Sequence, residues 1–140
     1  MPSYSVQILI EAPPEAVFDH VADLPAHGAW STDALDIVAT GDGVFRSSTR
    51  AKGKDITAEL TVIERTPPTR FVFDAVDLTG RWRHTFTLTP ANGGTMLRRD
   101  IAGSLGGAQL LLYWLVVLPI KKPNALRSLR TLKALVERAR

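Results

Sequence analysis

The chain has 140 residues, 45% of them hydrophobic and 22% charged, and it contains no cysteine. These proportions are ordinary for a folded globular protein, and the length suits one domain, residues 1–140, that buries roughly two-thirds of its extended surface. The lack of cysteine excludes disulfides, thiolate nucleophiles and cysteine-ligated metals, and it fits a reducing compartment. The first 30 residues lack a basic segment followed by an apolar run, so we expect a cytoplasmic protein.

Charge is unevenly distributed along the chain. Residues 121–140 hold seven basic side chains against one acidic, a net charge of +6, whereas the other 120 residues hold ten basic and thirteen acidic, a net charge of −3. The basic end is either a solvated helix face or a surface that favours an anionic partner such as a membrane. No recognisable motif or aromatic platform accompanies the charge, so we expect no nucleic-acid partner.

The chain opens with a strand, a double-proline turn and a short amphipathic helix. Apolar residues alternate with other residues over 6–10, which predicts a strand with one buried face. Pro13 and Pro14 end the strand, and Pro14 suits the first turn of a helix, where a missing N–H is tolerated. A second short turn follows the helix and ends at Trp30. The apolar face of the helix holds Val17, Phe18, Val21 and Leu24.

The middle of the chain predicts six further strands separated by turns. The turn signals are Gly41-Asp42-Gly43, Thr66-Pro67-Pro68 and Asn92-Gly93-Gly94. Because most of the loops are short, we expect an antiparallel meander of about seven strands. The predicted strands cover residues 35–40, 44–51, 56–65, 70–77, 80–89 and 95–103.

Alternation along these strands predicts one continuous apolar sheet face. It is clearest between Arg81 and Thr89, where every second residue is apolar or aromatic except His84. We expect this face to be concave. Its members are Ala58, Leu60, Val62, Phe71, Phe73, Ala75, Trp82, His84, Phe86, Leu88, Leu97 and Ile101.

A C-terminal helix is expected to cover that face. Leucines and a valine recur at helical spacing between Leu126 and Val136. The apolar run Leu110–Ile120 is expected to form the first half of the same helix, with a kink or break at Pro119. This run is apolar all round but too short to span a bilayer. Its surplus surface would meet the early helices, a homodimer mate or a membrane interface.

This order of elements resembles the polyketide cyclase/dehydrase and lipid-transport family of the START-like helix-grip (SRPBCC) superfamily. The resemblance spans residues 3–138, and its most family-like parts are the opening stretch to Trp30 and the Pro67-Pro68 turn before a Phe-rich strand. It implies an α+β helix-grip fold, in which a curved antiparallel sheet of about seven strands wraps around a long C-terminal helix, with two short helices after the first strand. The fold serves carriers, cyclases, hormone receptors and interaction modules.

His84 is the strongest candidate for a catalytic residue. It is expected to face inward between Trp82 and Phe86, where burial favours a neutral imidazole that can act as a base. The alternative is a core or pocket-wall histidine with one hydrogen-bond partner. Aromatase/cyclases of the resembled family move protons near one or two polar pocket groups, and a lone histidine in an aromatic wall is compatible with that.

Arg99 is the second inward-facing polar residue, by alternation with Leu97 and Ile101. A buried guanidinium is costly unless a carboxylate or an anionic ligand meets it. An ion pair within the protein and a contact with a ligand carboxylate or phosphate both remain open. The acidic residues on nearby strands are Glu59, Asp74, Asp77 and Asp100.

An apolar pocket is expected under the helix. Trp30 would either gate it or anchor the core. We expect no metal and no cofactor, because no His-x-x-x-His or His-x-Glu spacing and no Gly-rich phosphate or dinucleotide motif occurs. The expected pocket residues are Trp30, Leu60, Phe71, Phe73, Trp82, His84, Phe86, Leu97, Arg99, Ile101 and Trp114.

Three functions fit this pattern. The favoured one is a non-enzymatic carrier or sensor of an apolar small molecule such as a lipid, polyketide or isoprenoid, because a single plausible base is visible. The second is a cyclase, aromatase or dehydratase using His84 with Arg99. The third is an interaction module in which Leu110–Ile120 and the basic C-terminal helix contact a membrane or a second chain.

Overall fold

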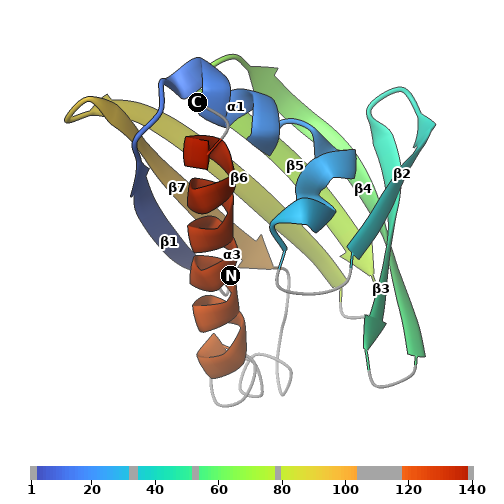
Figure 1. Ribbon diagram of the computed structural model, residues 1–140. Helices are drawn as coiled ribbons and strands as arrows, with labels where there is room; N and C mark the ends of the chain where they lie inside the picture. Colours follow the sequence, from blue (N-terminus) through green and yellow to red (C-terminus); the bar gives the residue numbers. More distant parts are fainter. Residues whose placement is uncertain (1–2, 32–34, 52–53, 78–79, 104–117, 139–140) are drawn as a thin grey trace.

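The computed structural model describes residues 3–31, 35–51, 54–77, 80–103 and 118–138 (Figure 1). Its strands form one antiparallel sheet in the order β1-β7-β6-β5-β4-β3-β2. Three helices are described: α1 (Pro14–Val21), the 3₁₀ helix η1 (Leu24–Ala29) and α3 (Leu118–Arg138). The strands are β1 (Ser3–Ile10), β2 (Leu35–Gly41), β3 (Val44–Ala51), β4 (Lys54–Thr66), β5 (Arg70–Asp77), β6 (Gly80–Ala91) and β7 (Gly94–Gly103).

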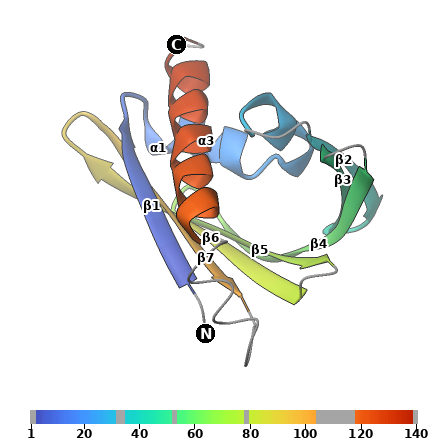
Figure 2. The same cartoon turned by 90° about the horizontal axis from the view of Figure 1, so that it is seen from below.

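The sheet is curved into a trough. Figure 2 shows α3 on the concave side beside β1, while β4, β3 and β2 turn up on the other side of the trough. Neighbours in the chain are neighbours in the sheet, except that β1 pairs with β7. This arrangement confirms the predicted helix-grip fold, including its seven strands and the two short helices after β1.

Apolar periodicity explains how the helices pack. The predicted face of α1 is buried, and Leu24 of η1 continues it. On α3 the residues at helical spacing point to the sheet, with Leu129 and Leu132 fully buried and Val136 nearly so. Burying such side chains stabilises the fold by roughly 1.5–3 kcal/mol each.

Strands β3 and β5 have their predicted bounds, and the other five extend one to three residues further at one end or both. Strand β4 is longer than expected at both ends and contains a register shift between Val62 and Glu64. Strand β6 runs two residues beyond its predicted end, to Ala91, where a tight turn leads into β7. The turn is tight because Asn92 and Gly93 adopt positive φ angles of 46° and 78°. Gly94 then lies so close to β1 that a Cβ atom there would overlap the carbonyl oxygen of Ile10.

Helix α3 is described from Leu118, so most of the predicted helical run Leu110–Ile120 lies outside the described residues. Pro119 falls in the first described turn of α3, and Pro123 lies inside the helix. Among the described residues, no helix is long and apolar enough to cross a membrane.

Candidate functional site

An aromatic cluster occupies the concave face where β5, β6 and η1 meet. The rings of Phe73 and His84 stack with centroids 4.6 Å apart and an angle of 4° between their planes. His27 and Trp30, from η1 and the residue after it, approach from the other side with their own centroids 4.5 Å apart. Phe86 contacts both groups, at 6.4 Å from Phe73 and 6.3 Å from Trp30. Offset and edge-to-face pairs of this kind add to the stability that burial supplies.

Strand register brings the polar residues of the site into this cluster. His84 lies between Phe73 on β5 and Ile101 on β7. Arg99 is directly opposite Phe86 on β6. Because alternate residues of a strand share a face, all of these side chains lie on the concave side.

The guanidinium of Arg99 is held by one nitrogen and two rings. Its Nη2 donates a hydrogen bond of 3.0 Å to His84 Nδ1. Its Cζ lies 5.1 Å from the centre of the Phe86 ring and 5.9 Å from that of Trp30, within the range of cation–π attraction. Burial lowers the pKa of Arg99 to about 10, against an opposing effect of nearby Tyr4, so the group stays charged at neutral pH.

No ion pair among the described residues joins Arg99 to a carboxylate. Asp74, one of the four candidate partners, lies on the convex face, where Arg83 Nε donates to its carboxylate at 2.8 Å. Asp100 pairs instead with Arg98, also on the convex side. Glu59 is exposed and in register with Val76, again on the convex side. Alternation explains these placements, because each acidic residue directly follows or precedes an inward-facing one.

The contact with Arg99 fixes the chemistry that His84 can perform. A guanidinium only donates, so His84 Nδ1 accepts and carries no proton. In the neutral ring the proton is therefore on Nε2. The lone pair that a general base would need is already engaged, and in this geometry His84 is suited to donate a hydrogen bond rather than to abstract a proton.

His27 and Trp30 are buried polar side chains of η1 and its cap. His27 is 4% exposed, and its Nε2 donates a 2.7 Å hydrogen bond to the carbonyl oxygen of Val21. Burial is the main cause that lowers the pKa of His27 to about 4, and the charge of Arg99 acts in the same direction. Trp30 is 2% exposed, and its indole N–H has no acceptor among the described residues.

An apolar row of residues crosses the concave face from β3 to β7. It runs from Phe45 and Leu60 through Ala75 to Trp82 and Gly103. Phe45, Ala75 and Trp82 remain partly exposed. The Trp82 ring lies over Gly103 so closely that a Cβ atom there would overlap it. Between these large rings the row holds Leu60 and the small side chain of Ala75.

The predicted pocket residues fall into two groups, apart from Trp114, which lies outside the described residues. Trp82, His84 and Arg99 are partly exposed on the concave face. The others are buried in the core; they are Trp30, Leu60, Phe71, Phe73, Phe86, Leu97 and Ile101. His27 and Tyr4 were not among the expected site residues. Tyr4 is in phase with Val6 on β1 and could have been found by extending the alternation two residues.

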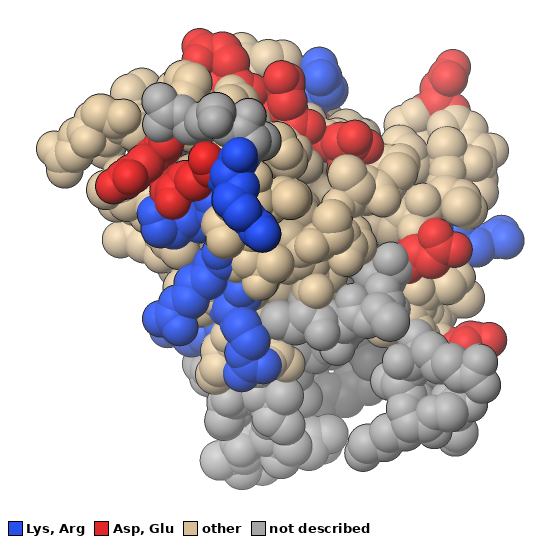
Figure 3. Space-filling model, viewed as in Figure 1, with Lys and Arg blue, Asp and Glu red and all other residues tan. Residues whose placement is uncertain are grey.

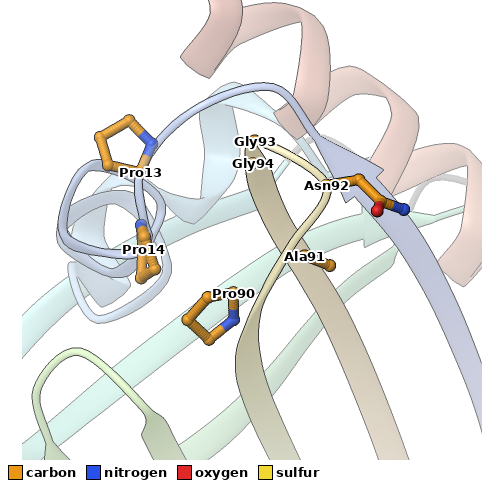
Figure 4. Close-up of a pocket in the computed structure, with 7 residues that line it drawn as sticks. All are labelled: Pro13, Pro14, Pro90, Ala91, Asn92, Gly93 and Gly94. Carbon is orange, nitrogen blue, oxygen red and sulfur yellow. The ribbon is translucent and has the colours of Figure 1, made fainter.

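A second feature is an open depression between the start of α1 and the β6–β7 turn (Figure 4). Its lining contains no charged side chain and, apart from the amide of Asn92, only proline, alanine and glycine. Such a lining offers no group for acid–base chemistry or metal binding. Elsewhere in the described ranges, no three His, Asp or Glu side chains gather as metal ligands.

Comparison with known proteins places the chain in a family. The model of the polyketide cyclase/dehydrase and lipid transport family matches residues 1–137. The chain belongs to this family. No curated protein matches the sequence.

Several solved structures share the fold of this chain. Protein CV1439 from Chromobacterium violaceum is 21% identical with a TM-score of 0.79, and the match covers 98% of this chain and 99% of CV1439. TTHA0849 from Thermus thermophilus is 23% identical with a TM-score of 0.78, and 99% of each chain is covered. StfQ, a two-domain aromatase/cyclase of the steffimycin biosynthetic pathway, is 12% identical with a TM-score of 0.74. The match covers 98% of this chain and 51% of StfQ.

Proposed function

We propose that this protein binds an apolar small molecule, such as a lipid, a polyketide or an isoprenoid, against the β3–β5 half of its concave sheet face. The observation that carries the proposal is the apolar row formed by Phe45, Leu60, Ala75 and Trp82. Apolar concave surfaces with few polar groups are the usual sites of small-molecule binding. The family description, with its lipid transport, supports the same class of ligand.

Helix placement supports this location. Helix α3 packs along β1, η1 packs against β2, and α1 rests on the β5–β7 end. The row over β3–β5 thus faces the interior of the trough seen in Figure 2. Its partly exposed apolar side chains would gain roughly 25 cal/mol for each Å² that a ligand removes from water.

Titration with a neutral solvatochromic dye tests the proposal. We expect one saturable site, weakened by Ala75→Phe because the new ring would fill space above the row, and weakened by Trp82→Ala because a wall would be lost. Ala102→Phe is the matched control, since Ala102 is opposite Arg83 on the convex face. Dye binding that does not saturate, or a dye affinity that neither Ala75→Phe nor Trp82→Ala changes, would contradict the proposal.

A second candidate is an aromatase/cyclase or dehydratase, favoured by the contact between Arg99 and His84. A guanidinium and an imidazole N–H beside an aromatic wall can stabilise an enolate oxygen during cyclisation. Turnover of a poly-β-keto substrate that is lost in His84→Ala, with ligand affinity retained, would support this activity. No turnover across a broad substrate panel would leave the carrier as the better description.

A further inference from the structure

We propose that the ligand carries a carboxylate and that Arg99, with the indole N–H of Trp30, binds this group. The inference rests on the proposed function, since it names the polar end of the same apolar ligand. Its starting point is a pair of buried donors: the Nε–H of Arg99 and the Nε1–H of Trp30, neither of which has an acceptor among the described residues. A buried donor left without an acceptor is costly, and a buried charge more so.

The Arg99 cation lacks the carboxylate partner that several exposed arginines have. Arg83, Arg70 and Arg98 each lie within ion-pair distance of a carboxylate. Arg99 instead meets His84 Nδ1 and the faces of two aromatic rings. Removing a guanidinium from water is costly, and neither an imidazole nor a ring face supplies a full negative charge in return. An anionic acceptor would supply it.

The geometry also orients the guanidinium for such an acceptor. The hydrogen bond to His84 holds Nη2, and the rings of Phe86 and Trp30 hold the group at 5.1 and 5.9 Å from their centres. Nε remains as a donor. Because Arg99 Cζ lies 5.9 Å from the centre of the Trp30 ring, the two unused N–H groups belong to neighbouring side chains. A carboxylate has two oxygens and can accept from two donors.

The residues around Arg99 favour a ligand with one negative charge and an otherwise apolar structure. Phe86 and Ile101, the cross-strand neighbours of Arg99 and His84, are apolar and buried. Arg99 is the one cation in the aromatic cluster described above, so a dianionic phosphate would keep an uncompensated charge in a poorly solvated place. A long-chain carboxylate leaves its apolar part for the apolar row beside Trp82.

Calorimetric titration with dodecanoate and with dodecanol tests the carboxylate site separately from the binding of an apolar molecule. We expect both to bind one site, with the carboxylate favoured by at least about tenfold, since a hydrogen bond to a charged group contributes that much. Arg99→Met should abolish this preference and leave dodecanol affinity within about twofold of the parent. Arg98→Met is the matched control, because Arg98 is the neighbouring arginine on the convex face.

Each result decides between the claims. Equal affinity of the parent protein for the two ligands, or a preference that survives in Arg99→Met, would overturn the carboxylate site while the proposed function stands. If neither ligand binds, the proposed function itself is contradicted. Thermal unfolding of Arg99→Met provides the folding control: we expect its midpoint to be equal or higher, because an uncompensated buried charge has been removed.

Discussion

At the scale of single residues, four polar or part-polar side chains gather where η1 meets the sheet. His27, Trp30, His84 and Arg99 are linked by ring contacts, one hydrogen bond and cation–π contacts. Alternation could predict that His84 and Arg99 face inward, since it depends only on strand phase. It could not predict the His84–Arg99 hydrogen bond, because that depends on cross-strand register. His27 was not among the predicted site residues, although it lies in the same short turn as Trp30.

His27 makes stability depend on pH. Its pKa is about 4 in the folded protein and near 6.5 when exposed, so the unfolded chain binds the proton more readily in between. Stability conferred by the neutral ring is thus complete above about pH 6.5 and is lost as the pH falls towards 4, by about 3 kcal/mol. Urea unfolding across this range measures the loss.

The variant His27→Gln should remove this part of the pH dependence, whatever its effect on stability at neutral pH. His20→Gln, on α1 at a partly exposed position, is the matched control and should retain the slope. An unchanged slope in His27→Gln would show that another group is responsible.

The aromatic core gives a second prediction at this scale. Phe86 is fully buried, so Phe86→Ala should lower the free energy of unfolding by about 3–5 kcal/mol. Phe45 lies on the same face but is only partly buried, so Phe45→Ala should cost clearly less. Chemical denaturation of both variants tests this, and equal losses would mean that the two rings are equally enclosed.

At the scale of elements, the strands were predictable and their irregularities were not. Apolar residues of β5, such as Phe71 and Phe73, recur with a period of two. Turn residues flank both β3 and β5, and the bounds of these two strands were predicted correctly. The register shift in β4 leaves the composition of the strand unchanged and so gives no signal in the sequence. The end of β6 was also missed, since Pro90 reads as a strand terminator although it lies near the turn.

Close packing of the β6–β7 turn against β1 predicts a cost for enlarging Gly94. A methyl group there would overlap the backbone of Ile10, which cannot move aside as a side chain can. Gly94→Ala should therefore lower the free energy of unfolding by about 1–3 kcal/mol. Gly41→Ala is the control, because its added carbon would make only an ordinary contact with Val44. Equal unfolding midpoints for the two variants would contradict the packing.

At the scale of the whole molecule, positive charge follows α3. Figure 3 shows blue side chains along this helix and a group of red ones above it. Arg127, Arg130 and Arg138 are exposed, while Lys133 pairs with Glu137. The expected contact through Leu110–Ile120 with a membrane or second chain stays a prediction, because most of that run lies outside the described residues.

Co-sedimentation with liposomes tests the membrane alternative. If α3 docks on an anionic surface, binding should increase with the fraction of anionic lipid, decrease with salt, and weaken when Arg127 and Arg130 are changed to glutamine. Arg46 and Arg81, on the convex face, provide a control pair of equal charge. Protein that stays in the supernatant at low salt would exclude docking.

The central claim is that the concave face holds an apolar small molecule, and native mass spectrometry of the protein purified from its own host tests it most directly. We expect one non-covalent adduct per chain, which organic solvent extracts as an apolar molecule and which Ala75→Phe reduces. Protein that carries no adduct, both as purified and after incubation with a lipid extract of the host, would contradict the claim.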